Sequence, residues 1–284
     1  MTVAARIAVF GSLNHDIVLS VPHMPASDET LRATNYAEFC GGKGFNQAVA
    51  AARLGASSAM VGCIGNDGAG ALLRSTLDRN HVNHQYVIAV EAHTGTAVIT
   101  TDANDVTIVI VAGANGVVNE SHAEDARAIL EHVDVLLLQG EISHHAAARA
   151  AQIVREAGGT VVFSPAPVHP DSALVVPHAT YIIANRGEAA ALGLVPSNTV
   201  IITEGAAGAR VGDIVVPIFP ATVVDPTGAG DSFTAAFAVA IAEGKDVVDA
   251  VRFGCAAGSW AVRIRGAEPS LPTRTQVDAV LLGA

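Results

Sequence analysis

The sequence predicts an α/β fold with a central, mostly parallel sheet flanked by helices and a small β lid. Short β-rich runs alternate with alanine-rich helical stretches, the pattern of a parallel sheet covered on both faces. The chain has 284 residues, 50% of them hydrophobic, which suits one large domain. Two stretches, 17–38 and 93–111, break this rhythm with β-type alternation and few helix formers.

The strands of the main sheet are predicted at short runs rich in β-branched residues: 7–10, 59–63, 133–139, 160–164, 181–184 and 200–203. Helices are predicted at longer stretches between and after them: 44–54, 69–80, 122–131, 146–157, 186–192, 231–243 and 247–261. The two exceptional stretches would form a small separate sheet, and a lid over a site is the natural use of it. No repeat or low-complexity linker interrupts the chain, so we expect a single domain over residues 1–284.

Composition argues against several classes of protein. The formal net charge of −11 and the lack of any Lys/Arg run disfavour a nucleic-acid or anionic-membrane partner. The three cysteines, Cys40, Cys63 and Cys255, are scattered and form no CxxC pair, which indicates reduced thiols in a cytoplasmic protein. The amino-terminal MTVAARIAVFGS has too short an apolar run for a signal peptide and reads as a first strand. The longest apolar stretch, 235–242, is far below the roughly 20 residues of a membrane span.

The segment DPTGAGDSFTAAFAVAIAEG, residues 225–244, places a glycine-rich turn before Asp231 and an apolar helix after it. Gly228 and Gly230 permit a tight turn that leaves successive backbone N–H groups free at a helix start, which is an anion site. An aspartate there is usually a helix cap, but a cap does not need Gly-Ala-Gly before it, and an idle glycine costs roughly 0.5–1 kcal/mol.

A carboxylate that accepts a hydroxyl proton, beside N–H groups poised for negative charge, suits transfer of a phosphoryl group to an alcohol. Residues 225–244 therefore predict this chemistry, with Asp231 as the base. The helix dipole is expected to keep Asp231 ionised and weakly basic.

A second glycine-rich segment, GGKGFNQAVAAARLG at 41–55, also opens a helix. It is not a Walker A loop, because Lys43 is followed by glycine and the GxxxxGK spacing is absent. Lys43 and Asn46 offer hydrogen-bond donors, and lysine is used at only one other position, Lys245. Upstream, Asn14 and Asp16 occupy alternate positions and share one side, where an amide and a carboxylate suit sugar hydroxyls. The alternative is an ordinary loop at 41–44 and a turn at 14–16.

NHD at 14–16, GGKGFNQAVAAARLG and DPTGAGDSF together resemble the two conserved regions of the ribokinase-like (phosphofructokinase-B type) carbohydrate kinases. The likeness runs essentially end to end. It implies a ribokinase-like sandwich with a β lid, in keeping with the two exceptional stretches. It also implies an ATP-dependent kinase that transfers the γ-phosphate to a primary hydroxyl of a sugar, with ribose, giving ribose 5-phosphate, as the preferred acceptor.

The resemblance implies the following site residues. The sugar would be held by Asn14, Asp16, Gly41, Gly42, Lys43, Asn46 and Glu141. The base would be Asp231, with an anion hole from Gly228, Ala229 and Gly230. The nucleotide would lie along Asn185, Thr203, Glu204, Gly205, Ala206, Gly208 and Gly230, with adenine near Cys255. Mg²⁺ would be placed near Asn185 and Glu188. A monovalent cation, usually potassium, would be held by Asp225, Thr227, Ala261, Ile264, Gly266 and Ser270. A homodimer through the lid is also typical of the family.

Three departures from the family pattern bear on these expectations. Phe45 stands where many relatives carry a small residue, and His15 lies between the two sugar ligands, so either could reshape the sugar pocket. Phe45 keeps a nucleoside or another sugar such as fructose open as the acceptor, because an aromatic ring can stack on a base. The segment VPSNT at 195–199 replaces a helix found in relatives, so residues 186–194 alone must form the crossover. The other alternative is a sugar-binding regulatory protein that has lost the chemistry.

Overall fold

The computed structural model of the chain describes residues 4–283. Residues 1–3, which precede the predicted first strand, and residue 284 of the predicted domain lie outside the described residues. The main sheet has nine strands in the order β13-β12-β11-β10-β9-β8-β1-β4-β5. Their bounds are β1 Arg6–Phe10, β4 Ser57–Gly65, β5 Asn83–Val90, β8 Val135–Leu138, β9 Thr160–Phe163, β10 Tyr181–Asn185, β11 Val200–Thr203, β12 Ala209–Val211 and β13 Ile214–Val216.

All neighbouring strands from β11 to β5 run parallel, and only β12 and β13 are antiparallel. Both faces of the sheet are buried, as β1 illustrates. Ile7 and Val9 belong to one hydrophobic cluster, whereas Ala8 and Phe10 belong to the cluster on the opposite face. Because every side chain of such a strand is buried, the strands read as continuous apolar runs, which is why they were predictable from sequence.

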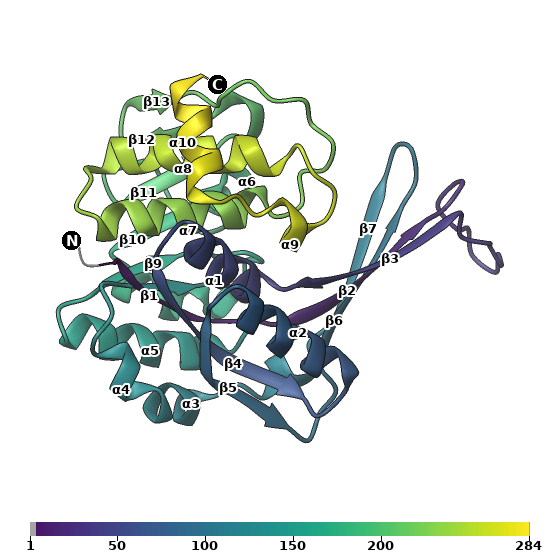
Figure 1. The fold of residues 1–284 in the computed structure, drawn as a ribbon, viewed down its shortest axis with the longest axis horizontal. Helices are drawn as coiled ribbons and strands as arrows, with labels where there is room; N and C mark the ends of the chain where they lie inside the picture. The colour runs from purple at the N-terminus through teal and green to yellow at the C-terminus, as the bar shows by residue number, and fades with distance from the viewer. Residues whose placement is uncertain (1–3, 284) are drawn as a thin grey trace.

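Helices cover both faces of the sheet (Figure 1). One face packs against α1 Lys43–Arg53, α2 Gly68–Arg79, α7 Ala229–Ala242, α8 Val247–Ala261 and α10 Arg274–Leu282. The other packs against α3 Glu120–Asp125, α4 Arg127–Leu130, α5 His144–Glu156 and α6 Arg186–Ala191. The short helix α9 Ala267–Ser270 contacts β3, α1 and α8. Single 3₁₀ turns occupy Gly113–Val117, Pro170–Leu174, Val176–His178 and Gly205–Ala207. The predicted α/β sandwich is confirmed.

A second sheet of four strands extends away from this body (Figure 1). Its strand order is β3-β2-β6-β7, with bounds β2 Asn14–Ser20, β3 Asn35–Gly41, β6 Gly95–Thr101 and β7 Val106–Val111. The pairs β2–β3 and β6–β7 are antiparallel, and β2–β6 is parallel. It occupies the two stretches of β-type alternation, but β2 begins before residue 17 and β3 ends after residue 38. We refer to these four strands as the lid sheet.

The shortened segment still closes its crossover. Strands β10 and β11 pair in parallel, with Ile182 opposite Val200, and the six-residue helix α6 is the connecting helix. The expectation that residues 186–194 serve as the crossover is therefore confirmed. The predicted helix at 122–131 divides into α3 and α4 at Ala126, and strands β5, β12 and β13 and helix α10 were not predicted. In the described part of the chain, no helix combines the length and apolar character needed to cross a membrane.

Candidate active site

A cavity of about 550 Å³ lies between the lid sheet, the starts of α1 and α7, and the carboxyl ends of β10 and β11. In α/β sheets the carboxyl ends of the strands are the usual place for ligands. The cavity brings together residues that are distant in sequence. Its predicted site residues are Asn14, Asp16, Gly42, Lys43, Asn46, Glu141, Asn185, Glu188, Thr203, Thr227, Gly228, Gly230 and Asp231.

Asp231 is buried in the first turn of α7, and its carboxylate does not cap the helix. The cap position is Gly228, which makes no side-chain capping bond. Instead, Asn46 Nδ2 donates to Asp231 Oδ2 at 2.9 Å, and Gln47 Nε2 donates to Asp231 Oδ1 at 3.0 Å. The carboxylate is thus held by the helix of the GGKG segment and lines the cavity that also reaches Asn185 and Glu188. The capping alternative is wrong.

Burial raises the pKa of Asp231 above its ordinary value, opposed by Lys43 and by the two amide donors. The expectation of a weakly basic carboxylate is therefore corrected, because the loss of solvent raises the pKa of Asp231 more than Lys43 and the two amide donors lower it. Burial lowers the pKa of Lys43, but the charges of Asp231, Glu141, Glu188 and Asp16 together raise it above its ordinary value. A protonated Lys43 thus faces the same cavity as Asp231.

The turn before α7 and the start of that helix contain the three residues that were predicted to form an anion hole, Gly228, Ala229 and Gly230. Gly228 has a φ of 81°, a left-handed conformation that favours glycine. Gly228 and Gly230 line the cavity at the helix start, where N–H groups lack intrahelical acceptors. The amide of Ala229, however, donates to Pro226 O at 3.2 Å. The expectation that Ala229 offers a free N–H is corrected, because the tight turn brings the Pro226 carbonyl within its reach.

Asn14 and Asp16 lie on β2 rather than in a turn, and both are buried and face the cavity. Asn115 Nδ2 donates to Asn14 Oδ1 at 2.7 Å and so orients that amide. A side chain at Gly41 would lie within 2.0 Å of Asp16 Oδ2, which explains why glycine stands there. Glu141 Oε2 accepts hydrogen bonds from Ser12 Oγ at 2.5 Å and from the Lys43 amide at 3.0 Å.

The two bulky residues that depart from the family pattern, Phe45 and His15, do not line the cavity. Phe45 is completely buried in the hydrophobic core, because each helical residue turns by about 100° and directs it away from the side that carries Lys43 and Asn46. His15 alternates with Asn14 and Asp16 along β2 and lies 3.6 Å from Glu38 instead. The interpretation that either side chain reshapes the pocket is wrong.

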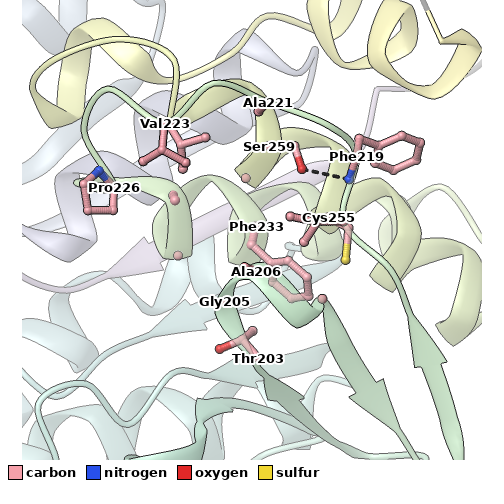
Figure 2. Close-up of a pocket in the computed structure, with 16 residues that line it drawn as sticks. Thr203, Gly205, Ala206, Phe219, Ala221, Val223, Pro226, Phe233, Cys255 and Ser259 are labelled. Atoms are coloured by element: carbon pink, nitrogen blue, oxygen red, sulfur yellow. Dashed lines mark hydrogen bonds between the residues drawn. The ribbon is translucent and has the colours of Figure 1, made fainter.

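A second cavity, of about 320 Å³, adjoins the first at three shared lining residues, Thr203, Pro226 and Gly230. Its walls are mostly apolar (Figure 2). The predicted nucleotide residues that line it are Thr203, Gly205, Ala206, Gly208, Gly230 and Cys255. Figure 2 also shows Ser259, whose Oγ accepts the Phe219 amide at 3.1 Å. Glu204 is not among the lining residues, because its carboxylate pairs with Arg186 and Arg210.

Asn185 and Glu188 form a capping box at the start of α6. The Glu188 amide donates to Asn185 Oδ1 at 2.9 Å, and the Asn185 amide donates to Glu188 Oε2 at 2.8 Å. This pairing fixes both side chains at the edge of the cavity. It leaves Glu188 Oε1 for a ligand.

Most of the residues predicted to bind a monovalent cation lie together beside the turn that precedes α7. Asp225 accepts from the amides of Thr227 at 2.9 Å and Gly266 at 2.8 Å, and Ser270 Oγ lies 3.4 Å from Thr227 O. Burial would raise the pKa of Asp225, but these hydrogen bonds hold it below its ordinary value. Ala261 ends α8, and its carbonyl accepts the Ile264 amide at 3.3 Å.

Comparison with known proteins identifies the family. The model of the pfkB family of carbohydrate kinases matches residues 4–274. The chain belongs to this family. The ribokinase of Bacillus subtilis is 39% identical over 291 residues, covering 97% of this chain and 99% of that protein. The structure of Thermotoga maritima ribokinase has a TM-score of 0.88 and 34% identity and covers 98% of this chain and 99% of that one. The structure of Arabidopsis thaliana ribokinase complexed with ribose and ATP has a TM-score of 0.89, 32% identity and the same coverage.

As a pfkB carbohydrate kinase, the protein is an enzyme that transfers phosphate to an alcohol, which is the chemistry predicted from residues 225–244. The alternative of a regulator without activity loses its support. Four apolar residues of the lid sheet also line the cavity and were not predicted as site residues: Ala97, Ile99, Ile108 and Ile110. These residues occupy alternate positions within the 93–111 stretch, and this alternation could have assigned them to one face of the lid sheet. Gln47, which contacts Asp231, and Gln139, which contacts Gln47, were also missed, and no sequence pattern distinguishes them.

Proposed function

We propose that this kinase phosphorylates the primary hydroxyl of ribose with ATP and releases ribose 5-phosphate and ADP. The observation that carries the proposal is the meeting of two cavities at Thr203, Pro226 and Gly230, with Asp231 beside that point. One cavity combines polar side chains with apolar lid residues, which suits a sugar, and the other is mostly apolar, which suits an adenine. The names of the ribokinase relatives support ribose as the acceptor.

The sugar would occupy the cavity under the lid sheet. Asn14, Asp16, Asn46 and Glu141 supply the mixture of amide donors and carboxylate acceptors that sugar hydroxyls require. Gly41 and Gly42 allow the sugar ring to approach the backbone. Lys43 supplies a positive charge among the carboxylates that line the cavity. The apolar lid side chains would exclude water from the reacting groups.

Asp231 would act as the general base. The hydroxyl proton passes to its carboxylate as the sugar oxygen bonds to the γ-phosphorus, and the bond from that phosphorus to the oxygen bridging to the β-phosphate breaks. A raised pKa makes the carboxylate a better proton acceptor, and Lys43 with the two amide donors opposes its protonation before the reaction. The amides of Gly228 and Gly230 would donate to the transferring phosphoryl oxygens.

ATP would lie with its adenine in the apolar cavity near Cys255 and its phosphates toward Gly230. Glu188 and Asn185 fit a Mg²⁺ that is also held by phosphates and water, since one carboxylate with a free oxygen is the usual protein share of such a site. When bound, Mg²⁺ neutralises charge on the phosphate oxygens. Glu204 would contribute through its backbone only.

We propose that a monovalent cation, K⁺, binds beside the turn that precedes α7. Asp225, Thr227, Gly266 and Ser270 offer the carboxylate, carbonyl and hydroxyl oxygens that such an ion takes, and Ala261 and Ile264 offer further carbonyls. Both oxygens of Asp225 already accept amides, so the ion would add to an ordered turn. It would rigidify the segment that presents Gly228 and Gly230.

We further propose a homodimer formed through the lid sheet. Five apolar or aromatic side chains of its edge strands are at least half exposed: Tyr36, Val106, Ile108, Val109 and Ile110. Burying them against a second copy would remove them from water. The cytoplasm remains our prediction for the site of action, supported by the unpaired thiols Cys40, Cys63 and Cys255.

The test of the function is Asp231→Asn, with Glu156→Gln, an exposed carboxyl on α5, as the control for lost charge. We expect kcat for ribose to fall by about 10²–10⁴-fold, because a positioned base contributes that much, with ribose binding and folding retained. A coupled ADP-release assay with ribose, adenosine and fructose measures turnover and acceptor choice together. Undiminished turnover in Asp231→Asn would refute the role of the base, and preference for adenosine or fructose would refute ribose as the acceptor.

A further inference from the structure

Two buried glutamines, Gln47 and Gln139, lie next to Asp231 in the interior and do not line the cavity. Gln47 is 1% exposed and Gln139 is 0% exposed. Gln139 Nε2 donates to Gln47 Oε1 at 2.7 Å, and Gln47 Nε2 donates to Asp231 Oδ1 at 3.0 Å. The contacts form a single chain of side-chain hydrogen bonds from the end of β8, through α1, to the start of α7.

The direction of this chain follows from the chemistry of its last member. An ionised carboxylate only accepts hydrogen bonds, so the NH₂ group of Gln47 must face Asp231 and its carbonyl must face away. That carbonyl in turn requires the NH₂ group of Gln139. Asn46 occupies the other carboxylate oxygen, so both oxygens of Asp231 are held from α1 while further lone pairs remain for the cavity.

A purely structural role explains the two glutamines poorly. Fully buried Gln side chains are uncommon, and an apolar residue would fill a core position without a polar cost. Within residues 4–283, Gln139 Oε1 has no hydrogen-bond partner, and an unpaired buried acceptor costs about 1–3 kcal/mol. A side chain at Gly11 would lie 2.0 Å from that oxygen, so the fold also leaves space for it. The N–H groups of the pair point toward the base.

We infer that Gln47 and Gln139 are positioning residues for phosphoryl transfer, Gln47 by holding the Asp231 carboxylate toward the acceptor hydroxyl and Gln139 by fixing the amide of Gln47. This inference rests on the proposed role of Asp231 as the base.

Several charged groups share the surroundings of Asp231. Lys43 on α1 stabilises its anion, whereas Glu141 after β8 and Asp16 on β2 disfavour it, as does burial. The N–H of Gln47 adds to the stabilising side. Its removal should therefore raise the pKa of Asp231 further and move the acidic limb of the rate profile to higher pH.

The experiment measures kcat and KM for ribose from pH 5 to 9 in Gln47→Leu, Gln139→Leu and the double variant. For Gln47→Leu we expect kcat to fall by about tenfold, since small misplacements of reacting groups cost up to about 10²-fold, and the acidic limb to shift upward. Gln139→Leu should also lower kcat and shift the acidic limb upward, but by smaller amounts. Because Gln139 acts through Gln47, the double variant should be no slower than Gln47→Leu.

Ser58→Ala is the matched control, because Ser58 Oγ donates a buried hydrogen bond to Ala48 O on the same helix without reaching the site. It should lower thermal stability and leave the pH profile unchanged. If Gln47→Leu does not fold, Gln47→Glu replaces it: the introduced carboxyl would share a proton with Asp231, moving the acidic limb upward, and an unmoved limb would overturn the inference.

The outcomes separate this inference from the proposed function. An inactive Asp231→Asn together with wild-type kcat and pH profile in Gln47→Leu would overturn the positioning role alone. Equal, additive losses of kcat in the two leucine variants with no change in the pH profile would do the same, because they indicate general destabilisation. An active Asp231→Asn would show that Asp231 is not the base and would refute the proposed function on which this inference rests.

Discussion

Replacing Asp16 with asparagine tests whether the sugar pocket is maintained at a cost to stability. Asp16 is 8% exposed. Burial, and then the negative charges of Glu141 and Asp231, raise its pKa from 3.8 to about 7, with Lys43 opposing. An asparagine has nearly the same shape and no charge, so it removes the electrostatic cost while it keeps the packing.

The size and sign of the effect follow from proton linkage. The folded protein keeps the Asp16 proton up to about pH 7, whereas the unfolded chain loses it near pH 4. The contribution of Asp16 to the free energy of unfolding is therefore greatest below pH 4, declines as the pH rises toward 7 and is constant above that. The whole decline is about 4 kcal/mol, of which about 2–3 kcal/mol falls between pH 5 and pH 8. Asp16→Asn lacks this decline.

Urea unfolding of the wild type and Asp16→Asn at pH 5 and pH 8, followed by circular dichroism, measures the effect. We expect the stability of the variant relative to wild type to rise by about 2–3 kcal/mol between the two pH values, while its affinity for ribose falls. The exposed Glu156→Gln should show no such change. A stability difference that is the same at both pH values would refute the reasoning.

Three further predictions concern the surroundings of the pocket. Phe45→Leu should lower the free energy of unfolding by about 1–2 kcal/mol in urea titrations without changing the ratio of ribose to adenosine activity. A changed ratio would show that Phe45 does influence the choice of acceptor. Gly41→Ala should raise KM for ribose by about tenfold or more and leave KM for ATP unchanged, because its Cβ would lie 2.0 Å from Asp16 Oδ2; equal effects on both substrates would contradict this. Asp225→Asn should raise the K⁺ concentration for half-maximal activity at constant ionic strength, and an unaltered K⁺ titration would remove Asp225 from the cation site.

Most of the architecture could be predicted from the sequence because it depends on local patterns. Buried parallel strands read as apolar runs, and amphipathic helices follow them, so six strands of the main sheet and the order of its helices were found. The glycine-rich turns before Asp231 and around Lys43 were also readable, since few residues other than glycine allow those conformations. Strands β12 and β13 were missed because they have only three residues each.

The tertiary structure alone decided what surrounds each side chain. Gln47 and Asp231 are 184 residues apart in sequence, and no local pattern joins them, so the glutamine chain was invisible until α1 and α7 were packed together. Packing also turned Phe45 into the core and raised the pKa of Asp231, because burial and neighbouring charges depend on contacts across the whole fold. Periodicity along a chain determines which elements form, whereas the free energy of a buried group depends on the atoms that the fold brings against it.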